Sequence, residues 1–280
     1  MCTMDMVQAQ KLCKTIIDEV EKVFVTSDRV LLNKVLCGFL SGGHILFEDN
    51  PGLGKTLLVK VLAKVTGCEW KRIQFTPDLM PSDISGTKIW KSNSSVFELE
   101  KGPIFTNFLL ADEINRAMPK TQSALLEAME ERQVSIEGTT YSLKPPFIVM
   151  ATQNPIEMEG TYPLPEAQVD RFLMKLKIKY PNLEEEKVIL ERMVVERELR
   201  VNPVLKLSDL DYMREILADL YMEERLKHYI LNLVQATRYP QRYPRISSLT
   251  GLIQYGASPR ATIFLARAAK ANAYLEHRAY

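Results

Sequence analysis

Short apolar runs alternate with stretches of helical periodicity over roughly the first 180 residues of the chain. This alternation is typical of an α/β domain built on a parallel sheet. The candidate strands are the apolar runs at residues 44–48, 70–76, 107–113, 147–154 and 172–178. Five such runs predict a doubly wound α/β domain with a five-stranded parallel sheet.

Two further segments have the pattern of hairpins inserted into this domain. Residues 87–102 alternate between polar and apolar side chains around a Ser/Asn turn, between the second and third candidate strands. Residues 133–143 alternate in the same way around Glu137 and Gly138, just before the fourth candidate strand. Alternation on both sides of a turn predicts two β-hairpins.

The pattern changes after residue 180. Pro181 and Asn182 interrupt the chain, and Glu184 to Glu186 enrich the first turn of a helix with acidic side chains. Helical patterns then cover residues 183–199, 208–219, 223–238 and 259–277. We therefore predict an α/β core over residues 1–181 and an all-helical domain over residues 182–280.

The charge balance excludes a global attraction to polyanions. The 280 residues include 36 basic and 35 acidic side chains, which gives a formal net charge of +1. This balance provides no general electrostatic attraction to nucleic acid or to an anionic membrane, so any polyanion site must be local.

The cysteines and the N-terminus indicate a reducing compartment. Cys2, Cys13, Cys37 and Cys68 form no C-x-x-C pair and have no histidines at zinc-finger spacing. This favours scattered buried thiols over a disulfide or metal framework. The N-terminus lacks the apolar segment of a signal peptide, and no apolar run approaches the roughly 20 residues of a membrane span. We therefore expect a cytoplasmic protein without a membrane span.

The clearest chemical motif is a phosphate-binding loop within LFEDNPGLGKTLLVK, residues 46–60. An apolar strand precedes the loop, an amphipathic helix follows it, and Gly-Lys-Thr stands at the junction. Backbone N–H groups at the start of such a helix surround phosphates, and glycines adopt the unusual φ values of the turn. We assign nucleotide binding to Asn50, Pro51, Gly52, Leu53, Gly54, Lys55, Thr56 and Leu57.

Three side chains of this loop need separate comment. Lys55 would contact the β- and γ-phosphates, and the Thr56 hydroxyl would bind Mg²⁺. Asp49 stands where the usual motif has its first glycine. A carboxylate directed at phosphates would repel them, so our hypothesis is that Asp49 points away and stabilises the turn.

Polar side chains follow two further candidate strands. Asp112 and Glu113 end the run NFLLADE, and Asn154 ends the run FIVMATQN. Because parallel sheets bind ligands beyond the carboxyl ends of their strands, all three residues should lie beside the loop. Asp112 would bind Mg²⁺, Glu113 would polarise the attacking water, and Asn154 would position the water or the γ-phosphate.

Two arginines are candidates for contacts with phosphate. Arg171 precedes the last strand and could stabilise transition-state charge in a neighbouring subunit, but an intrachain ion pair with Asp170 or Glu166 explains it equally well. Arg260 lies in the first turn of a predicted helix, where its charge opposes the helix dipole. From the residues alone, both a functional and a structural role remain open for each arginine.

These motifs, taken in order, resemble the MoxR family of AAA+ ATPases. The phrases that carry the resemblance are IQFTPDLMPSDISGT, KGPIF, KTQSALLEAMEERQV and ATQNPIEMEGTYPLPEAQVDRF. The likeness covers nearly the whole chain and implies a P-loop αβα core with a helical lid. The loop variant with an acidic residue in place of the first glycine is common in that family, which favours a working loop.

The resemblance also implies a role for each candidate side chain. The Walker A pair would be Lys55 and Thr56, and the Walker B pair would be Asp112 and Glu113. Asn154 would be sensor 1, Arg171 would be the arginine finger that acts on a neighbouring subunit, and Arg260 would be sensor 2. Arg116 lies in a matching phrase, but no role for it follows.

The family further implies cofactors and partners. A protein of this type would bind ATP or ADP with Mg²⁺, hydrolyse ATP, and form a ring, expected to be a hexamer, that remodels or matures protein complexes. Its partners would be protein clients and a separately encoded von Willebrand factor A domain protein. The family is expected to continue through a further lid segment, so we expect the lid over residues 182–280 to be incomplete at its C-terminus.

Two other functions remain open. A motor acting on DNA or RNA, related to the replicative helicases, would use the hairpins to contact its substrate. Lys88, Lys91 and Lys101 are balanced there by nearby acids, so we do not expect a nucleic-acid partner. An ATP-gated scaffold with little turnover would not need the catalytic residues that this chain has.

Overall fold

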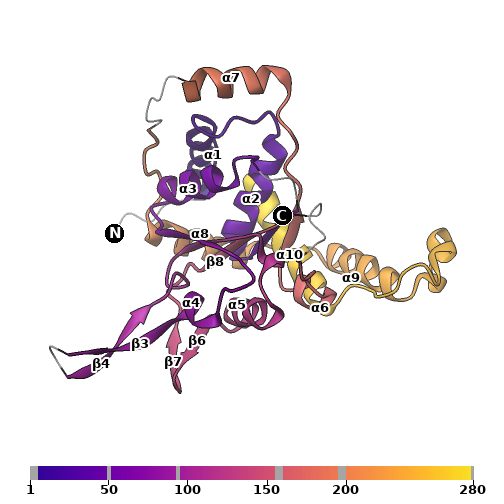
Figure 1. Cartoon of the computed structure of the whole chain (residues 1–280). Coiled ribbons are helices and arrows are strands. Elements are labelled where there is room, and N and C mark those ends of the chain that lie inside the picture. The colour runs from indigo at the N-terminus through magenta and orange to yellow at the C-terminus, as the bar shows by residue number, and fades with distance from the viewer. Residues whose placement is uncertain (1–5, 49–51, 93–94, 155–159, 195–199, 279–280) are drawn as a thin grey trace.

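A parallel sheet of five strands forms the centre of the protein (Figure 1). The computed structural model describes residues 6–48, 52–92, 95–154, 160–194 and 200–278. The strand order is β2-β5-β8-β1-β9, with bounds Trp70–Gln74, Phe108–Asp112, Ile148–Gln153, Ile45–Glu48 and Met174–Leu176. Each strand lies within one of the predicted ranges and all pairings are parallel, so the predicted α/β fold is confirmed.

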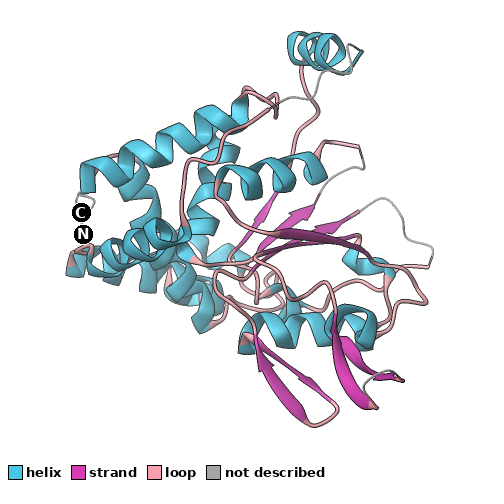
Figure 2. Ribbon diagram, turned by 90° about the vertical axis from the view of Figure 1, so that its left-hand side faces the viewer, coloured by secondary structure: helices cyan, strands magenta, loops and turns pink. Residues whose placement is uncertain are grey.

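Helices cover both faces of this sheet (Figure 2). One face packs with α1, α2 and α3, which span Met6–Glu21, Arg29–Ser41 and Lys55–Val65, and the other packs with α5, Pro119–Glu131. Phe108 and Leu110 of β5 are buried on the first face, whereas Leu109 and Ala111 are buried on the second. Burial on both faces explains why the strands are continuous apolar runs rather than alternating patterns.

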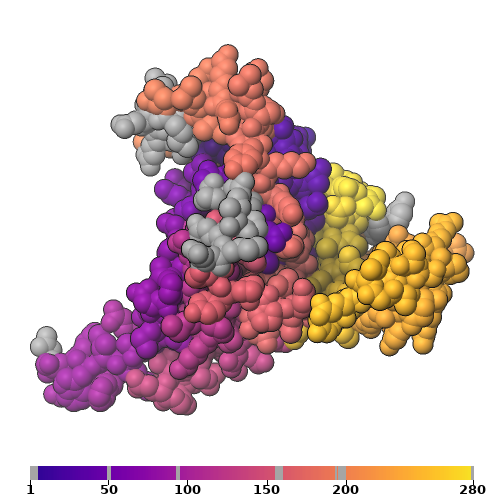
Figure 3. Space-filling view, turned by 45° about the vertical axis from the view of Figure 1, so that its right-hand side comes forward, coloured from indigo at the N-terminus to yellow at the C-terminus, as the bar shows by residue number. Residues whose placement is uncertain are grey.

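At both predicted hairpin positions the chain forms a two-stranded antiparallel ribbon. The strands are β3, Gly86–Lys91, with β4, Val96–Lys101, and β6, Gln133–Ile136, with β7, Thr139–Ser142. The second ribbon turns at Glu137 and Gly138, where φ is 47° and 78°. The ribbons contact each other through β3 and β6 and project from the same side of the body (Figure 1, Figure 3).

The C-terminal part of the chain is helical. Its helices are α7, α8, α9 and α10, which span Leu183–Val194, Leu207–Asp219, Glu224–Arg238 and Pro259–Leu275. The last part of the predicted helix at 183–199, residues 195–199, lies outside the described residues. Helix α9 extends away from the body together with the short helices η2, Pro240–Arg242, and η3, Pro244–Leu249 (Figure 3).

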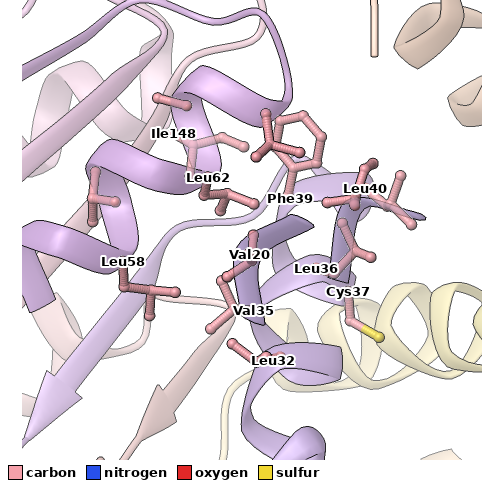
Figure 4. Packing of buried hydrophobic residues seen from close by; sticks show 14 of the residues in the cluster. Val20, Leu32, Val35, Leu36, Cys37, Phe39, Leu40, Leu58, Leu62 and Ile148 are labelled. Atoms are coloured by element: carbon pink, nitrogen blue, oxygen red, sulfur yellow. The ribbon is translucent and has the colours of Figure 1, made fainter. Parts of the chain in front are cut away.

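Helices α8 and α10 pack against α2. Leu210 and Met213 of α8 and Tyr274 of α10 belong to the same buried cluster as α1, α2 and α3, part of which is shown in Figure 4. The division of the chain at residue 182 stays a prediction.

Three short helices complete the described structure: α4, Pro81–Ser85, η1, Ile114–Arg116, and α6, Glu166–Val169. Within the described ranges, no helix is both long enough and apolar enough to cross a membrane. Helix η1 begins directly after β5 and places residues 113–116 at the end of that strand.

Candidate nucleotide-binding site

A polar cleft lies at the edge of the sheet where β2, β5 and β8 end. Its volume is about 490 Å³, and its lining is formed by Gly52, Leu53, Gly54, Lys55, Thr56, Leu57, Arg72, Gln74, Asp112, Glu113, Thr152 and Asn154. The structure therefore brings the described part of the predicted loop together with both predicted acids and the predicted amide. Asn50 and Pro51, like Asp49 and its expected orientation, lie outside the described residues.

The loop has the backbone conformation that phosphate binding requires. Gly52 and Gly54 adopt left-handed conformations, with φ of 85° and 76°. Helix α3 begins at Lys55 directly after Gly54, so its first N–H groups face the cleft. A helix N-terminus with these orphan donors and a nearby lysine provides an anion site.

Asp112 is held by hydrogen bonds to both of its carboxylate oxygens. The Thr152 hydroxyl donates to Oδ1 at 2.6 Å, and Thr152 is itself buried and accepts the backbone N–H of Glu113 at 2.7 Å. Arg72 of β2 donates to Oδ2 from Nη2 at 2.6 Å and from Nε at 3.1 Å. The Asp112 carboxylate therefore faces the cleft in a fixed orientation.

Glu113 is positioned from two sides. Its backbone adopts a left-handed conformation, with φ of 55°, which is uncommon for a residue with a side chain and typical of constrained sites. The Gln74 amide donates to Glu113 Oε2 at 2.7 Å, and Arg116 Nη1 lies 3.1 Å from the same oxygen. These contacts give Arg116, for which the sequence indicated no role, a place beside the proposed catalytic carboxylate.

The backbone of Asn154 is also fixed at the cleft. Its side chain is buried, and its carbonyl oxygen accepts a hydrogen bond from Asn115 Nδ2 at 3.3 Å. Asn154 follows β8, the strand that lies between β5 and β1. This placement puts its amide between the two acids and the phosphate loop.

A larger cavity, with more apolar residues in its lining, adjoins the polar cleft. It has a volume of about 1000 Å³ and shares Gly52, Leu53, Gly54 and Leu57 with the cleft. Residues 23–28, residues 178–182 and the inner side of α7 line the rest of it. The two cavities meet at the loop, so a nucleotide with its phosphates in the polar part would place its nucleoside in the apolar part.

The polar cleft has the donor set for Mg²⁺. Magnesium prefers oxygen ligands and is usually bound by one or two protein groups, with phosphates and water as its other ligands. The Thr56 hydroxyl and the Asp112 carboxylate line the same cleft as Lys55. The described residues contain no cluster of three or more His, Cys, Asp or Glu side chains that would form an all-protein metal site. The residues present therefore fit a metal ion that arrives with a nucleotide.

Arg171 and Arg260 lie elsewhere, at the opposite edge of the sheet. Arg171 precedes β9, and the neighbouring Leu173 N–H donates to the carbonyl of His44, directly before β1, at 2.8 Å. Arg171 Nε lies 3.0 Å from Glu130 Oε2, and Arg260 forms an ion pair with the same carboxylate. Neither arginine lines the polar cleft of its own subunit.

Additional contacts fix Arg260 at this edge. Its Nη1 lies 3.3 Å from Asp170 Oδ2, and Ser258, the N-cap of α10, donates to the same carboxylate at 2.7 Å. The expected alternative for Arg171 was an ion pair with Asp170 or Glu166; its acidic partner is instead Glu130 of α5.

His44 stabilises the same edge from within. Its Nδ1 accepts the N–H of Val149 at 2.9 Å and its Nε2 lies 3.1 Å from the carbonyl oxygen of Met129, so the neutral tautomer with a proton on Nε2 satisfies both contacts. Burial, with a smaller contribution from the positive charge of Arg132, lowers the pKa of His44 to about 4. The imidazole is therefore neutral at physiological pH.

Three polar residues of the cleft were not predicted from the sequence. Arg72 and Gln74 are two positions apart on β2, so they lie on the same side of the strand, and Thr152 is the penultimate residue of β8. The polar side chains near the end of the candidate strand WKRIQFT were the available signal.

Comparison with known proteins agrees with this architecture, which is the P-loop AAA+ α/β fold. Residues 44–174 match the ATPase family associated with various cellular activities (AAA), and residues 250–280 match the AAA lid domain. The crystal structure of a Cytophaga hutchinsonii protein assigned as an ATPase superimposes with a TM-score of 0.91 at 47% identity, over 98% of this chain and 83% of that one.

Two curated relatives are similar over most of their length. Chaperone MoxR1 of Mycobacterium tuberculosis is 47% identical over 94% of this chain and 69% of its own length. YeaC of Bacillus subtilis, whose function is uncharacterized, is 48% identical over 88% of this chain and 74% of its own length. The chain belongs to the MoxR family of AAA+ ATPases.

Proposed function

We propose that this chain is a Mg²⁺-dependent ATP hydrolase that assembles into a ring, expected to be a hexamer, and acts as a chaperone that remodels or matures protein complexes. The cleft with its loop, acids and amide supports the hydrolase activity. The similarity to a relative named Chaperone MoxR1 supports the chaperone role.

The observation that carries the proposal is the separation of two sets of side chains by the sheet. Lys55, Asp112 and Glu113 line the cleft at the carboxyl ends of the strands, whereas Arg171 lies at their amino ends. Strands of three to six residues separate the two edges by roughly 10–20 Å, which is beyond the reach of an arginine side chain. Arg171 therefore serves the cleft of a neighbouring copy.

The residues of one subunit have distinct tasks in this scheme. The N–H groups at the start of α3 and the Lys55 ammonium bind the phosphates. Glu113, held by Gln74 and Arg116, accepts a proton from the attacking water, and Asn154 orients that water. Mg²⁺ held by Thr56 and Asp112 would neutralise charge on the phosphates. Arg171 of the next subunit stabilises the charge that develops in the transition state.

Complementation between inactive subunits tests this arrangement. Lys55→Ala removes the phosphate contact within a subunit, and Arg171→Ala removes the contribution to its neighbour. In a mixed ring, an Arg171→Ala subunit whose neighbour is Lys55→Ala has a complete site. We expect hydrolysis to recover to a measurable fraction of the parent rate, whereas each variant alone is nearly inactive.

A matched mixture provides the control. Lys55→Ala and Glu113→Gln both damage the cleft of their own subunit, so mixing them creates no complete site and hydrolysis should not recover. Recovery in this control, or its absence from the first mixture in properly assembled rings, would contradict the assignment of Arg171 to the neighbouring site.

The clients can be sought with a trapped state. A Glu113→Gln subunit should bind ATP without hydrolysing it and so hold its protein clients and a von Willebrand factor A domain partner. Capture in ATP, compared with capture in ADP and with Lys55→Ala, would identify them. Equal recovery in all three conditions would contradict nucleotide-controlled binding of clients.

The structure gives little support to a nucleic-acid motor. On the first ribbon, Lys91 forms an ion pair with Glu98, and the Lys101 ammonium lies 5.1 Å from the centre of the Phe105 ring. These contacts engage two of the basic side chains of the first ribbon, which does not favour phosphate-driven binding.

A further inference from the structure

The most informative contact outside the predicted residues is that of Arg72 with Asp112. The guanidinium donates two hydrogen bonds, from Nη2 at 2.6 Å and from Nε at 3.1 Å, to a single carboxylate oxygen, Oδ2. The second oxygen, Oδ1, accepts the Thr152 hydroxyl at 2.6 Å. Both oxygens of the carboxylate that fits Mg²⁺ are therefore engaged by neighbouring side chains.

The position of Arg72 decides what this contact does. Arg72 lines the same cleft as Lys55 and Thr56, and its side chain is 46% exposed, so it can leave Asp112 without opening the core. An ion pair this exposed contributes little to stability. Arg72 and Asp112 both line the cleft, so a divalent cation bound to this carboxylate, directly or through water, would meet a second positive charge at close range.

We propose that Arg72 is the resident cation of the metal site: it neutralises Asp112 when the cleft is empty, and Mg²⁺ that arrives with ATP takes its place. The proposal rests on the proposed ATP-binding function and adds a residue and a step to it. Without such a cation, Asp112 would present an unbalanced negative charge to incoming phosphates. With Arg72 present, binding of ATP with its metal exchanges one cation at Asp112, the guanidinium, for another, Mg²⁺.

The exchange predicts how ATP affinity depends on Mg²⁺. In Arg72→Gln, Asp112 loses the counter-ion that contacts it directly, so ATP binding in EDTA should weaken about tenfold because the carboxylate repels the phosphates. Binding with Mg²⁺ should be unchanged or tighter, because the metal no longer competes with the guanidinium. The ratio of the Kd in EDTA to the Kd in Mg²⁺ should therefore rise about tenfold or more, measured by calorimetry or by a fluorescent ATP analogue.

Lys71 supplies a matched control on the same strand. It is adjacent to Arg72, also exposed, and points to the other side of β2. Lys71→Gln removes the same charge and should leave the ratio unchanged. Arg72→Lys keeps the charge but loses the pair of hydrogen bonds to Asp112, so it should give an intermediate ratio. This variant also serves as a control for a folding defect in Arg72→Gln.

Other outcomes would overturn the proposal. If Arg72→Gln weakens binding equally with and without Mg²⁺, Arg72 is a permanent phosphate ligand and no exchange occurs. If neither affinity changes, the contact with Asp112 has no role in binding.

Failure of the proposed function would look different, because the parent chain would then bind no ATP in either condition. Titration with Mn²⁺ alone, followed by electron paramagnetic resonance, still tests the exchange in that case. Arg72→Gln should bind Mn²⁺ about tenfold more tightly than the parent and Lys71→Gln, and equal affinities would overturn the exchange.

Discussion

The two edges of the central sheet carry opposite chemistry. At the carboxyl ends of the strands, a glycine loop, a lysine, two carboxylates and an amide surround a cleft of about 490 Å³. At the amino ends, Arg171 and Arg260 share the carboxylate of Glu130, and the neutral ring of His44 connects the surrounding backbone. We propose that the first edge binds a nucleotide and that the second stabilises charge on the nucleotide of a neighbouring subunit.

Under the proposed assignments, a single subunit would contain two half-sites rather than one whole site. A parallel sheet directs all of its carboxyl ends to one edge, so residues that precede strands are necessarily placed far from that edge. If Arg171 is catalytic, its position makes assembly a requirement for activity.

Arg171→Ala should have the largest effect. The variant is expected to reduce ATP hydrolysis by the assembled protein by about 10³-fold, because an arginine that stabilises the transition state contributes on that order. ATP binding to dissociated subunits should be unchanged, since their own cleft is intact. Steady-state assays measure the rate of hydrolysis, and equilibrium titrations measure the affinity for ATP. A comparable loss of ATP affinity in dissociated subunits would contradict the separation of the two edges.

Glu113→Gln should have the next largest effect, at the carboxyl edge. Hydrolysis should fall by about 10²-fold or more because the general base is lost, while ATP binding is retained. Glu131→Gln, an exposed acid on α5, serves as the control and should leave both quantities unchanged. Hydrolysis by Glu113→Gln at the parent rate would show that another group activates the water.

Glu130→Gln should have a moderate effect, and Glu131→Gln again serves as the control variant. Loss of the shared carboxylate leaves Arg171 and Arg260 without their common anchor. We expect kcat of the assembled protein to fall roughly tenfold with little change in KM, because misplacement of a catalytic group lowers the rate of the chemical step. A change confined to thermal stability would assign Glu130 a purely structural role.

His44→Gln should alter the pH dependence of stability. The ordinary pKa of 6.5 is lowered to about 4 in the folded chain, so between these values the unfolded state binds a proton that the folded state does not. The contribution of His44 to the free energy of unfolding is therefore complete above pH 6.5. It is lost as the pH falls toward 4, by about 3 kcal/mol in total. Urea unfolding of the parent and of His44→Gln across this range should show a shallower slope for the variant. Identical slopes would exclude His44 as the cause.

The parts of the fold that depend on local pattern could be predicted from the sequence. The strands are continuous apolar runs because both faces of the sheet are covered, and the loop of Gly52 to Thr56 is contiguous in the chain. The position of Asp112 and Glu113 followed from the general rule for strand ends. These features require no knowledge of which strand lies beside which.

Contacts between neighbouring strands could not be predicted in the same way. Arg72 reaches Asp112, and Thr152 reaches the same carboxylate, only because β5 lies between β2 and β8. That order is a property of the assembled sheet. Likewise, Arg171 and Glu130 are separated in sequence by three strands and a short helix, so their ion pair emerges only with the tertiary structure.

The carboxylate of Glu130 links two arginines from different parts of the chain into one electrostatic unit. Replacing either arginine leaves the other with a larger share of the negative charge of Glu130, which alters its strength as a ligand for phosphate. The effects of Arg171→Ala and Arg260→Ala should therefore be non-additive, with a coupling energy of about 0.5–3 kcal/mol in a double-mutant cycle. A substitution at one arginine thus cannot be interpreted without the identity of the other.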